Sequence, residues 1–162
     1  MQNKRSKFLH PIYKLSPVTW LLKHTIPHLD RLFFKLSNGK RSFSQPLSGL
    51  PTFLIKHRGA KTGTTRTTPL ICIPHGNDNE EIILIASNFG RNNNPAWYYN
   101  IKAHPEIIVN IKGKEFNYIA TEIEDNYTEY WEKAVNLYAG YQDYRNKTKR
   151  THIPILLLKR LN

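Results

Sequence analysis

The chain has 162 residues, 40% of them hydrophobic, with a single cysteine and a formal charge of +12 at pH 7. This length is the usual size of one compact domain, and one cysteine excludes an internal disulfide and any cysteine-cluster zinc or iron–sulfur site. A single cysteine also fits a reducing compartment, so we expect a cytoplasmic protein. No apolar run reaches the roughly 18 residues of a membrane span, and His10, Pro11 and Lys14 interrupt any signal-peptide core, so we expect a chain that neither spans a membrane nor is secreted.

The positive charge is concentrated near the N-terminus. Residues 1 to 45 hold nine lysines and arginines but only one acidic residue, Asp30, whereas the rest of the chain is close to balanced. Such a charge indicates an anionic partner, which can be nucleic acid, lipid headgroups or an acidic small molecule. Charge alone does not choose among these partners.

Two helical pieces are predicted before residue 40. Ser16-Pro17 begins the first, Pro27 interrupts or kinks it, and Asn38-Gly39 ends the second. The second piece is amphipathic, because a basic polar face with Arg31 and Lys35 lies opposite an apolar stripe. That stripe consists of Leu29, Leu32, Phe33 and Leu36, and Asp30 lies on the polar side.

Six strands are predicted after residue 51, each a β-branched or apolar run between turns. They cover residues 52–58, 67–75, 81–87, 107–111, 115–123 and 153–158, and the first three are expected to be consecutive antiparallel strands. Two helices lie between the strands. Asn94 caps a short one that ends at His104-Pro105, and Asp125-Asn126 caps one that runs through Tyr138.

Short turns, few helices and no strand–helix alternation indicate a mainly β (α+β) chain with an antiparallel barrel or sandwich rather than a Rossmann sheet. The sequence lacks the Gly-x-Gly-x-x-Gly fingerprint and the Walker phosphate loop. We assign residues 1–50 to a basic helical extension with a linker rich in Ser, Gln, Pro and Gly. Residues 51–162 form the β domain in this interpretation.

The turn at residues 59–66 is a candidate phosphate site. Its glycines let backbone amides approach an anion, Lys61 and Arg66 supply positive charge, and three threonines supply hydroxyls. Two charge-assisted hydrogen bonds of about 1.5–3 kcal/mol each would contribute several kcal/mol to ligand affinity. An ordinary polar turn with solvated charges fits the same residues.

Two aromatic segments are candidates for a ligand surface. Trp97 on the short helix can line a cleft near the end of the strand at Ser87, or it can plug the end of the barrel. Tyr138, Tyr141 and Tyr144 recur every third residue without aliphatic partners, so they predict a flat face with outward hydroxyls on which a planar ring can lie. Ordinary helix packing is compatible with the same spacing.

Other chemistries find little support in the sequence. The seven histidines lack His-x-His and His-Glu-x-x-His spacing, so no metal site is expected. There is no Gly-x-Ser-x-Gly elbow, and no paired carboxylates occur in a plausible cleft segment. Cys72 lies in an apolar strand, where a thiol is usually inert.

Residues 53–159 resemble the deazaflavin-dependent nitroreductase family. The motifs that carry the resemblance are Gly59 to Arg66 with Pro69-Leu70, Ala86-Ser87, Asn94 to Tyr98, Ala103 to Pro105, Tyr138 to Tyr144 and Thr151 to Pro154. Members of this family are split β-barrels related to the flavin-binding pyridoxamine-phosphate-oxidase fold. The resemblance therefore implies a six-stranded antiparallel split β-barrel with flanking helices and an N-terminal helical extension.

The resemblance also implies an oxidoreductase. Hydride would pass from reduced coenzyme F420, a deazaflavin with a phosphodiester and an acidic glutamyl tail, to a quinone, a nitro compound or another unsaturated acceptor. Lys61 and Arg66 would hold the phosphate, and Ser87 and Asn88 would approach the ring. The cofactor-binding residues implied are Gly59, Lys61, Thr62, Gly63, Arg66, Thr68, Pro69, Ala86, Ser87 and Asn88. The residues implied for the catalytic acceptor pocket are Trp97, Tyr138, Tyr141 and Tyr144.

Several alternatives stay open. Ala60 replaces a basic residue common in the family's loop, and Asn88 stands where its nitroreductases often have a lysine, so FMN is an alternative cofactor. A non-catalytic flavin or deazaflavin carrier is an alternative function, and a basic nucleic-acid-binding module is another. The N-terminal helix either caps the barrel with Leu29, Phe33 and Leu36 or lies peripherally on the anionic inner face of a membrane. The oligomeric state is left open.

Overall fold

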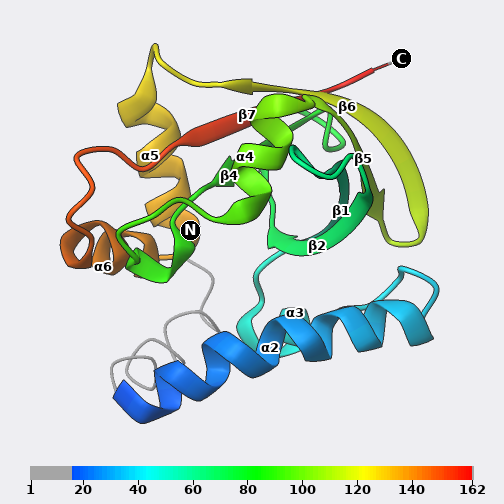
Figure 1. Cartoon of the computed structure of the whole chain (residues 1–162), viewed down its shortest axis with the longest axis horizontal. Coiled ribbons are helices and arrows are strands. Elements are labelled where there is room, and N and C mark those ends of the chain that lie inside the picture. Colours follow the sequence, from blue (N-terminus) through cyan, green and yellow to red (C-terminus); the bar gives the residue numbers. More distant parts are fainter. Residues whose placement is uncertain (1–15, 162) are drawn as a thin grey trace.

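The computed structural model describes residues 16–161, which form one antiparallel sheet closed into a barrel with flanking helices (Figure 1). The sheet has seven strands in the order β2-β1-β5-β6-β7-β4-β3. They are β1 (Thr52–Arg58), β2 (Thr65–Ile71), β3 (Ile73–His75), β4 (Glu81–Ile85), β5 (Glu106–Ile111), β6 (Lys114–Glu122) and β7 (Ile155–Arg160). Only Cys72 separates β2 from β3 in the chain, although they stand at opposite ends of this order, so the sheet curls until its ends meet. The predicted antiparallel barrel is confirmed.

The strand count differs from the prediction because the predicted strand 67–75 turns a corner. Its first part, β2, pairs with β1, and its second part, β3, pairs with β4. At the corner the N–H of Cys72 donates to the carbonyl of Pro51 at 2.8 Å. Cys72 is fully buried, so the apolar sequence pattern continues through the corner and does not reveal where β2 ends. Burial raises the pKa of this thiol, in line with the inert cysteine expected.

Strands β4 and β7 lie between two hydrophobic clusters. Ile82, Leu84, Leu156 and Leu158 belong to the cluster in the barrel, and the alternate residues Ile83, Ile85, Ile155 and Leu157 belong to the cluster against the helices. Both faces of these strands are therefore buried, which explains their continuous apolar sequence. The helices on the outer face are α5 (Tyr127–Leu137) and α6 (Gly140–Lys147) (Figure 1).

The helix predicted to run through Tyr138 is in fact two helices. Helix α5 ends at Leu137, and Tyr138 is extended, with φ −145° and ψ 103°. Helix α6 then begins at Gly140, where a Cβ atom would overlap the Tyr138 ring. The break therefore depends on a glycine that lets the Tyr138 ring lie against the backbone.

The short predicted helix is present as α4 (Ala96–Ala103). Its N-cap position is Pro95, and no side chain caps it, so the expected cap at Asn94 is wrong. The Asn94 side chain accepts a hydrogen bond from Arg150 instead.

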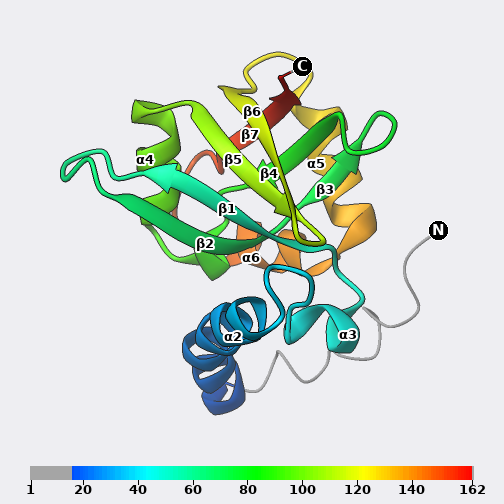
Figure 2. The same cartoon turned by 90° about the vertical axis from the view of Figure 1, so that its right-hand side faces the viewer.

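Helix α2 (Ser16–Leu36) runs through Pro27 as one element rather than two. It lies along one side of the barrel, beside the short helix α3 (Ser44–Ser48), which occupies part of the expected linker (Figures 1 and 2). No helix within residues 16–161 is both long enough and apolar enough to cross a membrane.

The buried face of α2 is not the predicted apolar stripe. Phe34 is buried, whereas Leu32, Phe33 and Leu36 are 50%, 41% and 74% exposed. Leu29 is half-buried. The alternative in which the stripe caps the barrel requires Phe33 and Leu36 to be covered, and the structure exposes both.

Asp30 explains why α2 presents this other face to the protein. Its carboxylate is buried and accepts hydrogen bonds at 2.8 Å from both the backbone N–H and the hydroxyl of Ser44, at the start of α3. The acid expected on the solvent side thus joins α2 to α3. A buried carboxylate with two such partners is satisfied, which favours this orientation of the helix.

Candidate functional site

The loop between β1 and β2 is the tip of a hairpin that projects from the barrel (Figure 2). Internal hydrogen bonds set its shape. The N–H of Gly59 donates to the Thr64 carbonyl at 2.9 Å, and that of Gly63 to the Gly59 carbonyl at 2.8 Å. The N–H of Ala60 donates to Oδ1 of Asn100 on α4 at 2.9 Å. These three amides are engaged within the protein and are not available to bind an anion.

Three cations lie in this loop or directly beside it, namely Arg58, Lys61 and Arg66. Lys61 and Arg66 are exposed, and within residues 16–161 neither forms an ion pair with a carboxylate. Nε of Arg66 lies 3.2 Å from where a Cβ on Gly59 would be, and the Arg58 guanidinium lies 3.3 Å from the same position on Gly63. The glycines therefore let both arginines lie against the loop. Arg58 is not among the predicted residues, and its only signal is its place directly before the loop.

Helix α4 connects the loop to the barrel interior. Asn100 holds the loop, Tyr98 is buried, and the Tyr98 hydroxyl donates to a carboxylate oxygen of Glu122 at 3.0 Å. Trp97 is partly buried against the cluster in the barrel. Both rings therefore help to seat α4 on the barrel end, and Trp97 has only part of its surface left for a ligand.

His57 on β1 is buried beside the predicted cofactor residue Thr68. Its Nε2 lies 3.0 Å from the Thr68 hydroxyl, and its Nδ1 has no hydrogen-bond partner in the described part of the chain. Burial, followed by the nearby charge of Arg66, lowers the pKa of His57, so the ring is neutral at pH 7. The Thr68 hydroxyl thus contacts a histidine, and Pro69 pairs with Leu54 across the hairpin.

After β4 the chain makes a strained turn, η2 (Asn88–Gly90). Asn88, Phe89 and Gly90 have φ angles of 47°, 56° and 74°, so two non-glycine residues in a row adopt left-handed backbone. Each such residue costs roughly 1–2 kcal/mol, and strain of this kind clusters at functional sites. Nδ2 of Asn88 donates to the Asn93 carbonyl at 2.9 Å. The Asn88 side chain therefore holds its own turn.

Arg150 holds the same turn from the other side. Its Nη1 donates to the Ala86 carbonyl at 3.0 Å and to Oδ1 of Asn94, its Nη2 to the Ser87 carbonyl at 2.6 Å, and its Nε to the Thr148 hydroxyl at 3.1 Å. Charge-assisted hydrogen bonds contribute about 1.5–3 kcal/mol each, enough to offset the strain of the turn. Arg150 is not among the predicted residues, since no local sequence pattern marks this role.

Two of the three predicted tyrosines are buried. Tyr138 and Tyr141 are 6% and 3% exposed in the cluster against the helices, and Tyr144 is half-buried at its edge. Their ring centroids lie 5.5–6.3 Å apart, and the Tyr138 and Tyr144 hydroxyls are 3.3 Å apart. Desolvation raises the pKa of Tyr141. The prediction of an outward phenolic face is therefore wrong, because β3, β4 and β7 supply the aliphatic partners that the segment lacks.

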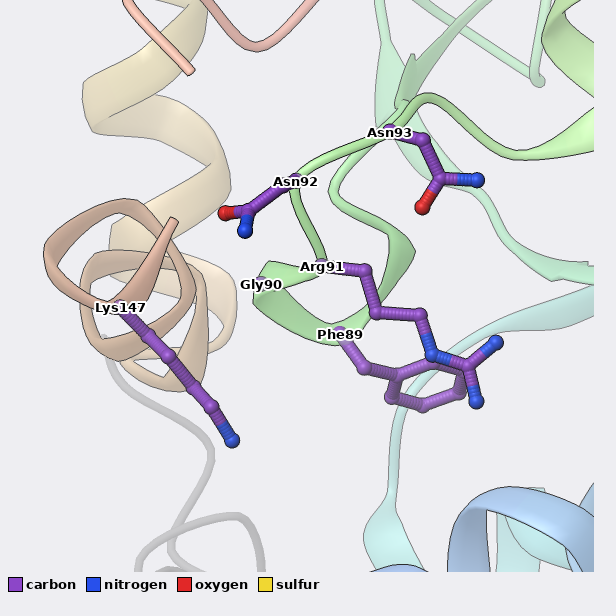
Figure 3. A pocket seen from close by; sticks show the side chains of 6 residues that line it. All are labelled: Phe89, Gly90, Arg91, Asn92, Asn93 and Lys147. Carbon is purple, nitrogen blue, oxygen red and sulfur yellow. The ribbon is translucent and has the colours of Figure 1, made fainter. Parts of the chain in front are cut away.

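A pocket of about 420 Å³ opens beside the strained turn (Figure 3). It is lined by Phe89, Gly90, Arg91, Asn92, Asn93 and Lys147. Figure 3 shows Arg91 alongside the Phe89 ring and Lys147 extending from α6, so the pocket is positively charged. The Phe89 ring meets Tyr144 edge-on, with 6.0 Å between centroids. Tyr144 thus contacts a residue that lines this pocket, although no predicted site residue lines it.

The predicted cofactor residues fall into two groups. The first comprises Gly59, Lys61, Thr62, Gly63, Arg66, Thr68 and Pro69 on the β1–β2 hairpin, and the second comprises Ala86, Ser87 and Asn88, which follow β4 and lead into η2, the turn that packs against α6. No recorded hydrogen bond or ring contact within residues 16–161 joins the loop cations to the tyrosines. The connection is indirect, since Arg150 joins Ser87 to Asn94, which precedes α4, and α4 holds the loop.

Comparisons with known proteins agree with the predicted family. A family model described as F420H(2)-dependent quinone reductase matches residues 31–160. The F420H(2)-dependent quinone reductase Rv1261c of Mycobacterium tuberculosis (strain ATCC 25618 / H37Rv) is 32% identical over 149 residues, 87% of this chain and 96% of the relative. The putative F420H(2)-dependent quinone reductase Rv3178 of the same strain is 30% identical over 112 residues, 68% and 90% of the two chains.

Solved structures give the same result. The F420-H2 dependent reductase FDR-A is 33% identical, with a TM-score of 0.59 over 67% of this chain and 94% of that chain. A chain described as a domain-swapped dimer is 29% identical, with a TM-score of 0.62 over 88% of this chain and 99% of that chain. The predicted fold, oxidoreductase class and cofactor are confirmed at the level of the family. The chain belongs to the F420H(2)-dependent quinone reductase family.

Proposed function

We propose that this chain reduces a quinone with hydride from reduced F420, and that the β1–β2 loop holds the acidic part of the cofactor. The observation that carries the proposal is the set of cations on that loop, Arg58, Lys61 and Arg66, of which Lys61 and Arg66 have no carboxylate partner in residues 16–161. When bound, reduced F420 supplies the hydride. The protein's own part is to bind, to orient and to exclude water.

The number of cations fits F420 better than FMN. A single phosphate needs one or two positive groups, whereas F420 adds carboxylates from its glutamyl tail. Arg58 lies against Gly63 and Arg66 against Gly59, so the two guanidinium groups approach the loop from different glycines. A cofactor with several acidic groups can pair with both and with Lys61.

The acceptor end of the site lies, in this proposal, at the strained turn. Ser87 and the half-buried Tyr144 border it, and the pocket lined by Phe89 opens next to them. Tyr138 and Tyr141 contribute through packing, because their rings are buried in the cluster that supports Tyr144. Of the three tyrosines predicted to be catalytic, only Tyr144 is therefore proposed to contact the acceptor. Trp97 lies, in this proposal, at the other end of the site.

The test is a titration of the wild-type protein with F420 and with FMN, followed by ring absorbance, and steady-state oxidation of reduced F420 with menadione as acceptor. Loss of one charge-assisted contact in Lys61→Ala or Arg66→Ala should weaken F420 binding roughly 10- to 100-fold. Lys114→Ala is the control, because it removes an exposed lysine from the β5–β6 hairpin. Its F420 affinity should equal that of the wild type.

Each alternative has its own outcome in this experiment. FMN binding as tight as F420 binding would support the FMN alternative, and F420 binding without turnover would support a carrier. Binding that is equally weak before and after the lysine and arginine substitutions would overturn the proposed clamp. Salt-sensitive binding of DNA without any F420 binding would support the nucleic-acid module instead.

We also propose that α2 lies on an anionic lipid surface, at the inner face of the cytoplasmic membrane. Large apolar side chains are exposed on α2 and α3, namely Leu32, Phe33, Leu36 and Leu47. Exposed cations accompany them, namely Arg31, Lys35, Lys40 and Arg41. Each Lys or Arg near an anionic bilayer adds about 1 kcal/mol, and the apolar side chains add insertion energy.

Flotation with vesicles tests this surface. The wild type should bind vesicles that contain phosphatidylglycerol and not vesicles of phosphatidylcholine alone. Leu32→Ser with Leu36→Ser should abolish binding, and Leu161→Ser, at an exposed leucine near the other end of the chain, should not. If light scattering finds a dimer whose formation depends on Leu32 and Leu36 while vesicles do not bind, a second copy covers this face and the membrane proposal fails.

A further inference from the structure

Arg150 connects the segment after α6 to two segments that lie more than fifty residues earlier in the sequence. It donates to the carbonyls of Ala86 and Ser87 after β4, to the side chain of Asn94 before α4, and to the hydroxyl of Thr148 after α6. These segments form the acceptor end of the proposed site and the approach to α4. Two further hydrogen bonds join the same segments, from the Thr148 hydroxyl to the Arg91 carbonyl at 3.0 Å and from the Lys149 N–H to Oδ1 of Asn92 at 2.9 Å. Within this network Arg150 is the residue that bonds to both Ser87 and Asn94.

The bonds of Arg150 are directed at backbone rather than at a carboxylate. No ion pair within residues 16–161 includes it, and two of its four acceptors are main-chain carbonyls. Burial lowers its pKa, yet a guanidinium stays charged at neutral pH. A planar fork with fixed donor directions holds two successive carbonyls in a defined orientation, which a lysine ammonium cannot do.

The strained turn needs such support. Left-handed backbone at Asn88 and Phe89 persists only where the surroundings over-determine it. On one side the turn is closed by the Gly90 N–H, which donates to the Ser87 carbonyl at 3.0 Å, and by the Asn88 side chain. The Ser87 carbonyl also accepts from Arg150, so this single oxygen joins the internal bond of the turn to the guanidinium.

We propose that Arg150 is a positioning residue of the reductase, which holds the turn at residues 86–91 in the shape that receives the cofactor ring and the acceptor. The inference rests on the proposed function. It assigns no contact between Arg150 and the reacting atoms, since the guanidinium acts through Ser87 and Asn94. Its loss should therefore change the geometry of the turn first, and turnover as a consequence.

The experiment uses the full-length protein with Arg150→Lys, Arg150→Gln and the control Lys149→Gln. Lys149 is the neighbouring exposed cation, and its recorded hydrogen bond is made by its backbone N–H, which the substitution preserves. In both Arg150 variants amide hydrogen exchange should accelerate in residues 86–91, and kcat/KM with menadione should fall about 100-fold. The control should match the wild type in both readouts, and Arg150→Lys should not rescue either.

Several outcomes would overturn the inference. Exchange at residues 86–91 that is unchanged in Arg150→Gln would show that the turn does not depend on the guanidinium. Faster exchange with unchanged kcat, KM and F420 affinity would leave only a structural role. If Arg150→Gln does not fold, Asn94→Ala removes one acceptor and should give the same two changes to a smaller extent. If the wild type itself binds no F420, both the proposed function and this inference fail. If the wild type is active and the Arg150 variants match it in amide exchange and kcat/KM, only this inference fails.

Discussion

The β1–β2 loop and the segment Tyr138 to Tyr144 are held in shape by different forces. The loop is set by hydrogen bonds and glycine conformations, and its cations Lys61 and Arg66 are exposed. The tyrosine segment is set by packing, with two of its three rings inside a hydrophobic cluster. Substitution of a loop cation should therefore change ligand binding and leave stability intact, whereas substitution of a buried tyrosine should change both.

The largest effect should come from Tyr141→Ala. Removal of a fully packed aromatic side chain should reduce the free energy of unfolding by about 3–5 kcal/mol, because it leaves a cavity in the cluster. Urea unfolding followed by fluorescence measures the change. Lys61→Ala is the matched variant from the other region and should change stability by less than about 0.5 kcal/mol. Equal changes in the free energy of unfolding would mean that the two regions do not differ in how they contribute to stability.

A comparison of two turn glycines, Gly63 and Gly76, separates the effect of backbone strain from the effect on ligand binding. Gly63→Ala and Gly76→Ala both place a side chain at positive φ, 66° and 74°, and each should cost roughly 1–2 kcal/mol in urea unfolding. A Cβ at residue 63 meets the Arg58 guanidinium, whereas one at residue 76 meets nothing within 4 Å. Only Gly63→Ala should therefore weaken F420 binding in an absorbance titration. A similar loss of affinity in both variants would mean that Arg58 is not part of the binding surface.

The loop could be predicted from the sequence because its signals are local. Glycines, threonines and cations within eight residues specify a turn and its charge, and β-branched or apolar residues mark the strands on either side. The position of β1 is confirmed to the residue. The corner at Cys72 could not be predicted, since an apolar residue is equally suitable inside a strand and at a buried barrel corner.

The tyrosine segment and α2 could not be predicted because distant residues decide which faces are buried. The aliphatic partners of Tyr141 lie on β3, β4 and β7, which the spacing of the tyrosines does not reveal. On α2 the face with Phe34 and Asp30 is buried instead of the periodic apolar stripe, because Ser44 donates two hydrogen bonds to the buried Asp30 carboxylate. Arg150 was missed for the same reason, since three of its four acceptors lie more than fifty residues away.

The tyrosine segment itself can be divided by two conservative substitutions. Tyr138→Phe and Tyr144→Phe each remove one hydroxyl of the pair that lies 3.3 Å apart, and each should cost about 0.5–1.5 kcal/mol in unfolding. Only Tyr144 lies at the edge of the cluster beside Phe89, so only Tyr144→Phe should also change KM for menadione. A change of KM in Tyr138→Phe alone would reverse this assignment.

The smallest effect concerns His57, which is buried as the tyrosines are but lies next to Arg66 of the loop. Burial and that charge hold its folded-state pKa below the ordinary value of 6.5. As pH falls through 6.5, His57 is therefore protonated in the unfolded chain before it is protonated in the folded chain. Stability from this group is fully present above that pH and declines below it, by at most about 0.8 kcal/mol between about pH 8 and pH 6.

Urea unfolding at these two pH values, with wild type, His57→Gln and His28→Gln, measures this contribution. His57→Gln should flatten the decline, whereas His28→Gln, at an exposed histidine on α2, should leave it unchanged. Burial is the larger cause of the lowered pKa and the charge of Arg66 the smaller, so bound F420 that neutralises Arg66 should flatten the wild-type decline only in part. A decline in His57→Gln as steep as that of the wild type would mean that this pH dependence does not come from His57.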